Sequence, residues 1–260
     1  MSEDVLLVKE ADGVVTLTLN RPEVMNSLNF QLLFALRDAV ESVRFRRDIR
    51  VIIITGAGDK AFCSGADLKE RATLAPEKVR EYIFTIRNLF TAIEQLNKPV
   101  IAAVNGIALG GGTELALASD IRIASKTATM GLTETRLAII PGAGGTQRLP
   151  RLVGLSKAMD ILLRGKAMGP EEALAIGLVD RLIEPEIFME EVMKFAEQLA
   201  SGAGKAMGYI KAAVYEGIGL PMEQALAVER KYGLENLGTH DAKEGLVAFA
   251  EKRKPNFLSR

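Results

Sequence analysis

The chain has 260 residues and a mass of 28.1 kDa, enough for one large domain or for a domain with an appended lobe. Hydrophobic residues make up 48% and charged residues 25%, proportions that exclude collagen-like and disordered proteins. Lysine and arginine together number 33, as do aspartate and glutamate, so no overall positive field attracts nucleic acid or an anionic membrane.

The first half of the chain alternates strand and helix patterns. Asp12-Gly13 between two β-branched stretches predicts a hairpin, and the uninterrupted apolar run Val51 to Thr55 predicts a buried strand. An apolar period of 3.6 residues predicts the helices. In chain order, the expected elements are strands at 5–8 and 14–19, a helix over 29–44, a strand at 51–55, a helix over 76–96, a strand at 99–104, a helix over 113–118 and a strand at 121–124.

From about residue 150 onward, helical periods dominate, and only 179–183 has a strand pattern. The expected helices are 157–164, 171–176, 188–200, 206–216, 222–232 and 242–253. Strand, strand and helix recur at roughly 45 to 50 residues in the earlier part. This recurrence predicts an α/β fold, with a layered spiral core over residues 1–185 and a helical region over 186–260.

Several kinds of chemistry are excluded by residue counts. The single cysteine, Cys63, excludes an internal disulfide, and the single histidine, His240, excludes histidine-rich metal sites. We therefore expect carboxylates to carry any proton transfer. The apolar run 99–118 is interrupted by Asn105 and Glu114, so it does not predict a membrane span. The acidic N-terminus lacks the features of a signal peptide and predicts a cytoplasmic protein or a mature chain restarted at Met.

Glycine-rich turns are candidates for ligand binding. Residues 56–61 fit G-x-G-x-x-A, but 63–65 interrupt the helix that a dinucleotide-binding fold needs at this point. Residues 64–67 and 109–113 each follow a strand and approach a helix start, where unpaired N–H groups favour negative charge. Two such N–H groups that converge would form an oxyanion site, and the alternative is a pair of tight turns in a packed core.

Two glutamates stand beside these apolar turns. Glu114 is the only formally charged residue from 99 to 119, so burial there requires it to be neutral, paired or functional. Its alternative role is that of a first-turn residue favoured by the helix dipole. Glu134 precedes a second glycine-rich stretch and, taken alone, is more typical of a solvated loop carboxylate. Joint chemistry requires that the two carboxyls lie close enough to share a substrate.

Two basic segments remain. Arg44, Arg46, Arg47 and Arg50, with one aromatic neighbour, Phe45, are more typical of a solvated helix end than of nucleic-acid binding. The segment 251–257 near the C-terminus is either plain surface or a contact to a coenzyme A phosphate.

Three segments together resemble the enoyl-CoA hydratase/isomerase (crotonase) family. They are Ala61 to Glu70, Ala102 to Ile121, and Ile140 to Leu149. The resemblance covers nearly the whole chain, from Leu19-Asn20-Arg21-Pro22 to residues 248–253. It implies a ββα spiral with C-terminal helices that assemble into a trimer or a dimer of trimers.

The resemblance also implies roles for particular residues. By matching position, the N–H groups of Ala66 and Gly111 would be oxyanion donors, and Glu114 and Glu134 would be the catalytic pair of a hydratase acting on a 2-enoyl-CoA thioester. The acyl pocket would be lined from the 71–96 region. No metal or redox cofactor is implied, because coenzyme A is part of the substrate. The implied coenzyme A contacts are Met25, Ser64, Ala66, Asp67, Leu68, Lys69 and Gly111, with Phe249 and Lys252 reaching the coenzyme A of a neighbouring subunit.

Several alternatives remain open from the sequence. The same fold hosts double-bond isomerases, which often keep one of the two acids, and residues 66–72 with 134–148 look closest to 3-methylglutaconyl-CoA hydratases. Many hydratases have Gln-Pro where this chain has Leu132-Thr133, which affects the expected position of Glu134. An RNA-binding relative has lysines where this chain has Phe30, Phe34 and Asp38, which argues against RNA binding. An NAD-dependent dehydrogenase is the remaining alternative.

Overall fold

The fold is built on two sheets in a computed structural model that describes residues 4–260. Residues 1–3, on which the expectation about N-terminal targeting partly rests, lie outside the described residues. The larger sheet has the order β1 (Leu6–Ala11), β2 (Val14–Leu19), β3 (Val51–Gly56), β5 (Val100–Val104), β7 (Ile121–Ser125) and β10 (Arg181–Ile183). The smaller sheet has the order β4 (Ala61–Cys63), β6 (Ile107–Leu109), β8 (Thr129–Gly131) and β9 (Ala167–Met168).

The two sheets alternate along the chain and so form a spiral. Three successive strands of the larger sheet, β3, β5 and β7, are each followed by a strand of the smaller sheet. All pairings in the larger sheet are parallel except the expected β1–β2 hairpin, which turns at Asp12 and Gly13, both with positive φ. The predicted α/β spiral is confirmed, but the sequence analysis missed the smaller sheet. Its strands have two or three residues, too few to show an alternating pattern.

The helices mostly follow the expected ranges. In the spiral they are α1 (Phe30–Val43), α2 (Leu68–Thr73), α3 (Pro76–Glu94), α4 (Gly111–Leu117), α5 (Gly145–Val153), α6 (Leu155–Arg164), α7 (Pro170–Ala175) and α8 (Phe188–Ala200), with 3-10 helices η1 (Pro22–Val24), η2 (Glu134–Leu137) and η3 (Pro185–Ile187). The helices that follow are α9 (Gly204–Gly217), α10 (Met222–Leu237) and α11 (His240–Ala250). Helix α4 begins two residues before the predicted start, and α5 was not among the predicted helices.

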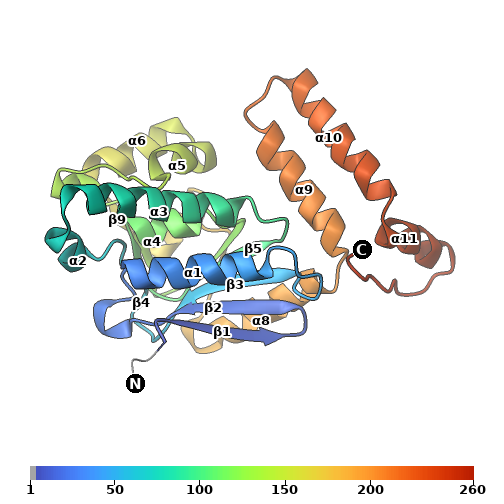
Figure 1. The fold of residues 1–260 in the computed structure, drawn as a ribbon, viewed down its shortest axis with the longest axis horizontal. Coiled ribbons are helices and arrows are strands. Elements are labelled where there is room, and N and C mark those ends of the chain that lie inside the picture. The colour runs from blue at the N-terminus through green and yellow to red at the C-terminus, as the bar shows by residue number, and fades with distance from the viewer. Residues whose placement is uncertain (1–3) are drawn as a thin grey trace.

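Alternate residues of β3 pack into two different hydrophobic clusters. Ile52 and Ile54 point toward α1 and α3, whereas Val51 and Ile53 point toward α8 on the other face. Figure 1 shows this layering, with α1 and α3 above the larger sheet and α8 below it. Because β3 is buried on both faces, its side chains are apolar on both faces and its sequence is an unbroken apolar run.

The last three helices leave the body of the molecule. In Figure 1, α9 and α10 form an antiparallel pair that projects to the right, with α11 beside them. Helix α8 instead buries Phe188, Val192 and Ala196 against the larger sheet. The predicted division at residue 186 therefore does not follow the packing, because α8 belongs to the spiral core and the projecting part starts at α9.

None of the helices described for residues 4–260 combines the length and the apolar character needed to cross a membrane.

Candidate active site

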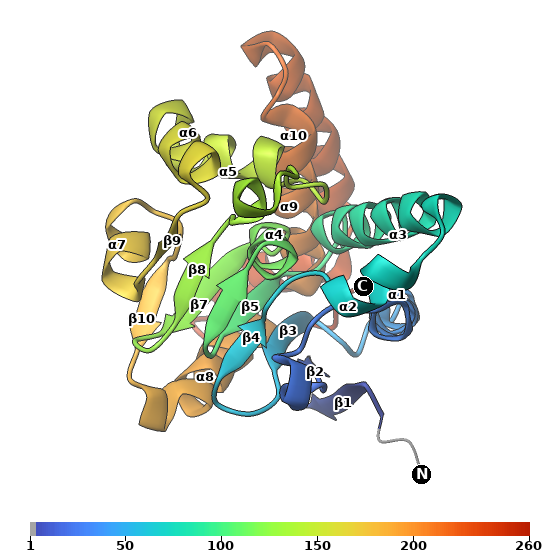
Figure 2. The same cartoon turned by 90° about the vertical axis from the view of Figure 1, so that its left-hand side faces the viewer.

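A cavity of about 120 Å³ lies where the loops after β4 and β6 meet η2 and the segment that leads to α5. These loops come together because β4, β6 and β8 are neighbours in the smaller sheet, with β4–β6 and β6–β8 both parallel. Figure 2 shows α4 lying over these strands, next to α5. Ser64, Ala66, Gly111, Glu114 and Glu134 all line the cavity, so the structure brings together residues that are up to 70 positions apart.

The N–H groups of Ala66 and Gly111 lie side by side at this cavity. A Cβ built on Gly111 would lie 3.5 Å from the Ala66 nitrogen. Neither N–H donates a hydrogen bond to an acceptor within residues 4–260. The residues before them, Gly65 and Gly110, have φ values of 101° and 51°, a left-handed region that glycine adopts readily. The two free donors can therefore converge on a single ligand oxygen.

Glu114 is buried in the first turn of α4, and its side chain is 3% exposed. Its Oε1 accepts hydrogen bonds of 2.8 Å from the N–H groups of both Ala143 and Gly145. Burial raises the pKa of this carboxyl above its ordinary value, while the two N–H donors and Arg148 act in the opposite direction. The two N–H groups fix the orientation of Glu114 and stabilise its ionised form.

Glu134 lies on η2 and is 9% exposed. Its Oε2 is buried without a hydrogen-bond partner among the described residues. A Cβ built on Gly110 would lie 3.2 Å from its Oε1, so this carboxyl sits directly against the loop that carries the Gly111 N–H. Burial and the negative charge of Glu114 raise the pKa of Glu134 to about 7. The two acids thus have different environments, and Glu134 is the one that lacks donors.

A second layer of contacts supports Glu114. Arg148 forms an ion pair of 2.8 Å with Glu94 and donates a 2.9 Å hydrogen bond to the carbonyl of Ala143. These contacts hold the loop whose N–H groups orient Glu114. The sequence analysis quoted Arg148 within a family motif but assigned it no role.

Two further segments contribute walls to the cavity. Arg71, Tyr82, Ile83 and Ile86 line it from the 71–96 region, and the binding of an acyl chain there stays a prediction. Leu137, Ile139 and Ile140 complete the cavity, and the sequence analysis gave these residues no such role. These residues follow Glu134 directly in the sequence, and η2 is too short to carry the chain away from the site. Their position after Glu134 could therefore have predicted that they line the cavity.

Known proteins resemble this chain over nearly its whole length. The family model described as enoyl-CoA hydratase/isomerase matches residues 9–260. A crotonyl-CoA hydratase from Syntrophomonas wolfei is 43% identical over 259 residues, with 99% of both chains covered. A mitochondrial methylglutaconyl-CoA hydratase from Mus musculus is 40% identical over 255 residues, covering 96% of this chain and 81% of the mouse protein. The crystal structure of an enoyl-CoA hydratase from Bacillus anthracis has a TM-score of 0.96 at 45% identity, covering 98% of this chain and 100% of that chain.

The chain belongs to the enoyl-CoA hydratase/isomerase family. The resemblance that the sequence motifs indicated is therefore confirmed, and so is the expectation of a crotonase-type fold. The expectation that the chain is an enzyme of this family is confirmed as well.

Within this family fold, the unusual Leu132-Thr133 dipeptide does not displace Glu134 from the cavity. Leu132 is buried, and its Cδ1 would lie 2.9 Å from a Cβ built on Gly145. Thr133 is the N-cap of η2 and also lines the cavity. The dipeptide therefore packs against the loop that holds Glu114.

The residues implied as coenzyme A contacts have different positions in the single chain. Leu68 lines the cavity together with Ser64, Ala66 and Gly111, whereas Met25, Asp67 and Lys69 do not. Asp67 is the N-cap of α2, and its carboxylate forms a 2.9 Å ion pair with Arg21. The Asp67 side chain therefore stabilises the start of α2. Its contact with coenzyme A stays a prediction.

Phe249 and Lys252 lie at the end of α11 and just after it. Phe249 is 86% exposed, and Figure 1 places α11 at the opposite end of the molecule from α2. Within one chain these residues are remote from the cavity. The expected contact with the coenzyme A of a neighbouring subunit stays a prediction.

Proposed function

We propose that this enzyme adds water across the 2,3 double bond of a 2-enoyl-CoA thioester and so forms a 3-hydroxyacyl-CoA. The observation that carries the proposal is the meeting of two buried glutamates and two free N–H groups at one cavity. The relatives named as hydratases support it, because the family also contains isomerases. One of the two carboxyls receives N–H donors and the other does not. This difference suits a reaction that needs both a base and an acid.

The oxyanion pair would activate the substrate. The N–H groups of Ala66 and Gly111 would bind the thioester oxygen and withdraw electron density from the conjugated double bond. As negative charge develops on this oxygen, each donor is worth about 2.7 to 4 kcal/mol by comparison with acyl-transfer sites. Carbon 3 then becomes open to attack by water.

The two glutamates would divide the proton transfers. Glu114, oriented by the N–H groups of Ala143 and Gly145, which favour its ionised form, takes a proton from water while the water oxygen bonds to carbon 3. The π electrons pass to the thioester oxygen as an enolate. The pKa of Glu134 is raised to about 7, so a substantial fraction of this carboxyl carries a proton at neutral pH, and it donates that proton to carbon 2 as the enolate collapses. The net change is the addition of one water molecule.

The same proposal covers coenzyme A. Met25, Ser64 and the segment from Ala66 to Lys69 would contact its adenine and pantetheine parts, as the family resemblance implies. No metal or redox cofactor takes part in the proposed steps, because coenzyme A belongs to the substrate and the electrons move within the acyl group.

The test is hydration of crotonyl-CoA, followed by the loss of ultraviolet absorbance of the conjugated thioester. Glu114→Gln and Glu134→Gln should each lower kcat by about 10²- to 10⁴-fold, because each removes one proton-transfer group. Glu81→Gln, an exposed glutamate on α3, is the matched control and should retain wild-type activity. Wild-type turnover by either active-site variant would rule out the proposed roles.

Double-bond isomerisation is the alternative on the same fold. An isomerase moves a proton between carbons and takes up no water. Incorporation of oxygen from ¹⁸O-labelled water into the product distinguishes the two reactions, and we expect one labelled hydroxyl per turnover.

A second candidate function concerns the acyl chain. The guanidinium of Arg71 lines the cavity and forms no ion pair or hydrogen bond with residues 4–260. An unpaired cation in this position favours an acyl chain that ends in a carboxylate, such as a methylglutaconyl group. Arg71→Met should then lower kcat/KM for the carboxylate-bearing substrate more than for crotonyl-CoA. An equal effect on both substrates would exclude this preference.

We further propose that the enzyme is a homo-oligomer, a trimer or a dimer of trimers. Large apolar side chains are exposed along α9, α10 and α11: Ile210, Val214, Ile218, Met222, Leu226, Leu234, Leu237, Leu246 and Phe249. Apolar residues in such number on projecting helices are typical of an interface between subunits.

A further inference from the structure

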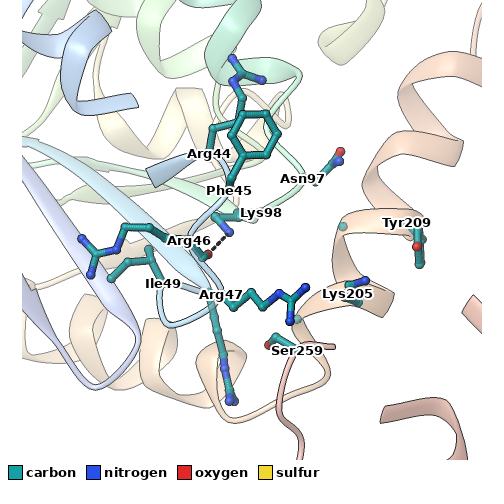
Figure 3. Close-up of a pocket in the computed structure, with 13 residues that line it drawn as sticks. Arg44, Phe45, Arg46, Arg47, Ile49, Asn97, Lys98, Lys205, Tyr209 and Ser259 are labelled. Atoms are coloured by element: carbon teal, nitrogen blue, oxygen red, sulfur yellow. Dashed lines mark hydrogen bonds between the residues drawn. The ribbon is translucent and has the colours of Figure 1, made fainter. Parts of the chain in front are cut away.

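A second cavity, of about 430 Å³, lies where the end of α1 and the segment before β3 face the start of α9. It shares no lining residue with the active-site cavity. Figure 3 shows Arg47 reaching from its loop toward Ser259 and Lys205. The cavity is therefore a separate feature in which cationic and hydroxyl groups come together.

The N-terminus of α9 opens into this cavity. The helix has 14 residues, and its N-cap residue, Ala203, has no side chain that could accept a hydrogen bond. The N–H groups of Gly204, Lys205 and Ala206 have no acceptor within residues 4–260. Unpaired N–H groups and the positive end of the helix dipole favour an anion at such a point.

Ser259 provides an independent indication of a ligand. Its side chain is 6% exposed, and its Oγ has no hydrogen-bond partner among the described residues. A Cβ built on Gly204 would lie 2.6 Å from this Oγ, so the hydroxyl sits against the first residue of α9. An unsatisfied buried hydroxyl is unfavourable, and a ligand oxygen at the helix start would satisfy it.

Six cationic side chains line the cavity, and only two of them, Arg44 and Arg46, form ion pairs with other described residues. Arg44 pairs with Glu41, and Arg46 pairs with both Glu10 and Asp48. Arg50 and Lys98 donate hydrogen bonds to backbone carbonyls.

In contrast, the side chains of Arg47 and Lys205 form no ion pair or hydrogen bond within residues 4–260. Behind Ser259, Asp241 accepts the N–H groups of Leu258 and Ser259 and pairs with His240, and the main-chain oxygen of Arg260 accepts the N–H of His240. Asp241 is therefore already engaged, and Arg47 and Lys205 remain available for a ligand.

We propose that this cavity binds a phosphate group, held by the N-terminus of α9, the Ser259 hydroxyl, Arg47 and Lys205. These donors come from two sides of the cavity, and helix N-termini and basic side chains are common ligands of phosphate oxygens. The cavity has room for more than the phosphate itself, and the rings of Phe45 and Tyr209 also line it. The phosphate is thus either a free ion or part of an aromatic monoester, which the two probes below distinguish.

The experiment is calorimetric titration of the full-length protein, at low ionic strength, with inorganic phosphate and with phenyl phosphate. Each protomer should bind one phosphate, and tighter binding of phenyl phosphate would indicate that the ligand carries an aromatic group. The double variant Arg47→Gln/Lys205→Gln should bind at least about tenfold more weakly, because it loses two charged donors. Arg37→Gln removes an exposed arginine elsewhere on α1 and should bind like the wild type.

Failure of the wild type to bind either probe saturably, or equal binding by the double variant, would overturn the proposal. Ser259→Ala gives a second criterion. It should weaken phosphate binding without lowering the melting temperature in phosphate-free buffer, because the hydroxyl has no partner to lose. Wild-type affinity in this variant, or a lower melting temperature without phosphate, would contradict the role given to Ser259.

Discussion

At the scale of single residues, the two glutamates of the cavity show how the surroundings give the same side chain two different electrostatic environments. Both carboxyls are buried, but only Glu114 receives backbone N–H donors. Glu134 has a buried oxygen without a partner and stands near the charge of Glu114. Differences of this kind separate the pKa values of neighbouring acids and supply a base and an acid at the same pH.

The raised pKa of Glu134 has a consequence for stability. Its pKa is about 7 in the folded protein against an ordinary value of 4.5, so folding favours the neutral form. This favourable contribution is complete below pH 4.5 and is lost as the pH rises through 7. Glu134→Gln cannot ionise, and its free energy of unfolding should therefore exceed that of the wild type by up to about 3 kcal/mol at pH 8.5.

Denaturant unfolding at pH 4.5 and at pH 8.5 measures this difference. The advantage of Glu134→Gln should be largest at the higher pH and should shrink toward pH 4.5. The surface variant Glu81→Gln should show no such trend. An advantage that does not change with pH would contradict the pKa assigned to Glu134.

At the scale of elements, helix α4 depends on the absence of side chains at its start. A Cβ on Gly112 would overlap the carbonyl oxygen of Cys63 in β4. The close approach of this helix to the smaller sheet places Gly111 beside Ala66 and directs Glu114 into the cavity. The glycine run is thus needed for close packing as well as for the turn.

Gly112→Ala should therefore lower the free energy of unfolding by about 1 to 3 kcal/mol, because backbone must move to relieve the overlap. Gly233→Ala is the matched control, since Gly233 is exposed within α10 and a Cβ there would have no neighbour within 4 Å. That control should be neutral or stabilising by up to about 1 kcal/mol, because alanine favours the helix. Equal effects of the two substitutions in thermal unfolding would refute the packing argument.

At the scale of the whole molecule, the projecting helices expose apolar side chains to solvent in the single chain. Helix α9 and its C-cap residue expose Ile210, Val214 and Ile218 at intervals of four residues, which places them on one face. The spiral core, in contrast, buries its apolar residues in two clusters around the larger sheet. The projecting helices therefore have an apolar face that the proposed oligomer would cover.

Ile210→Glu/Ile218→Glu should reduce the mass of the particle in solution, measured by light scattering, from a multiple of 28.1 kDa toward the single chain. Charge at these positions would have to be buried in the interface, which is unfavourable. Gln224→Glu adds the same kind of charge to α10 and should leave the assembly intact. A double variant that keeps the wild-type mass would place the interface elsewhere.

Sequence alone determined the features that depend on local pattern or on contiguous motifs. The α/β class, the hairpin, the long helices and the buried strand β3 follow from apolar periodicity, which depends on the backbone geometry of each element. The family followed from three motifs, and the candidate residues Glu114, Glu134, Ala66 and Gly111 lie in or beside them.

Tertiary structure decided what depends on contacts between distant segments. The smaller sheet, the attachment of α8 to the core and the lining residues after Glu134 left no periodic signal, because each element is short or is placed by packing. The inequality of the two glutamates likewise arises from N–H groups 29 and 31 residues away from Glu114. Periodicity is local and can be read along the chain, whereas burial and hydrogen bonding at a site are set by which segments the fold brings together.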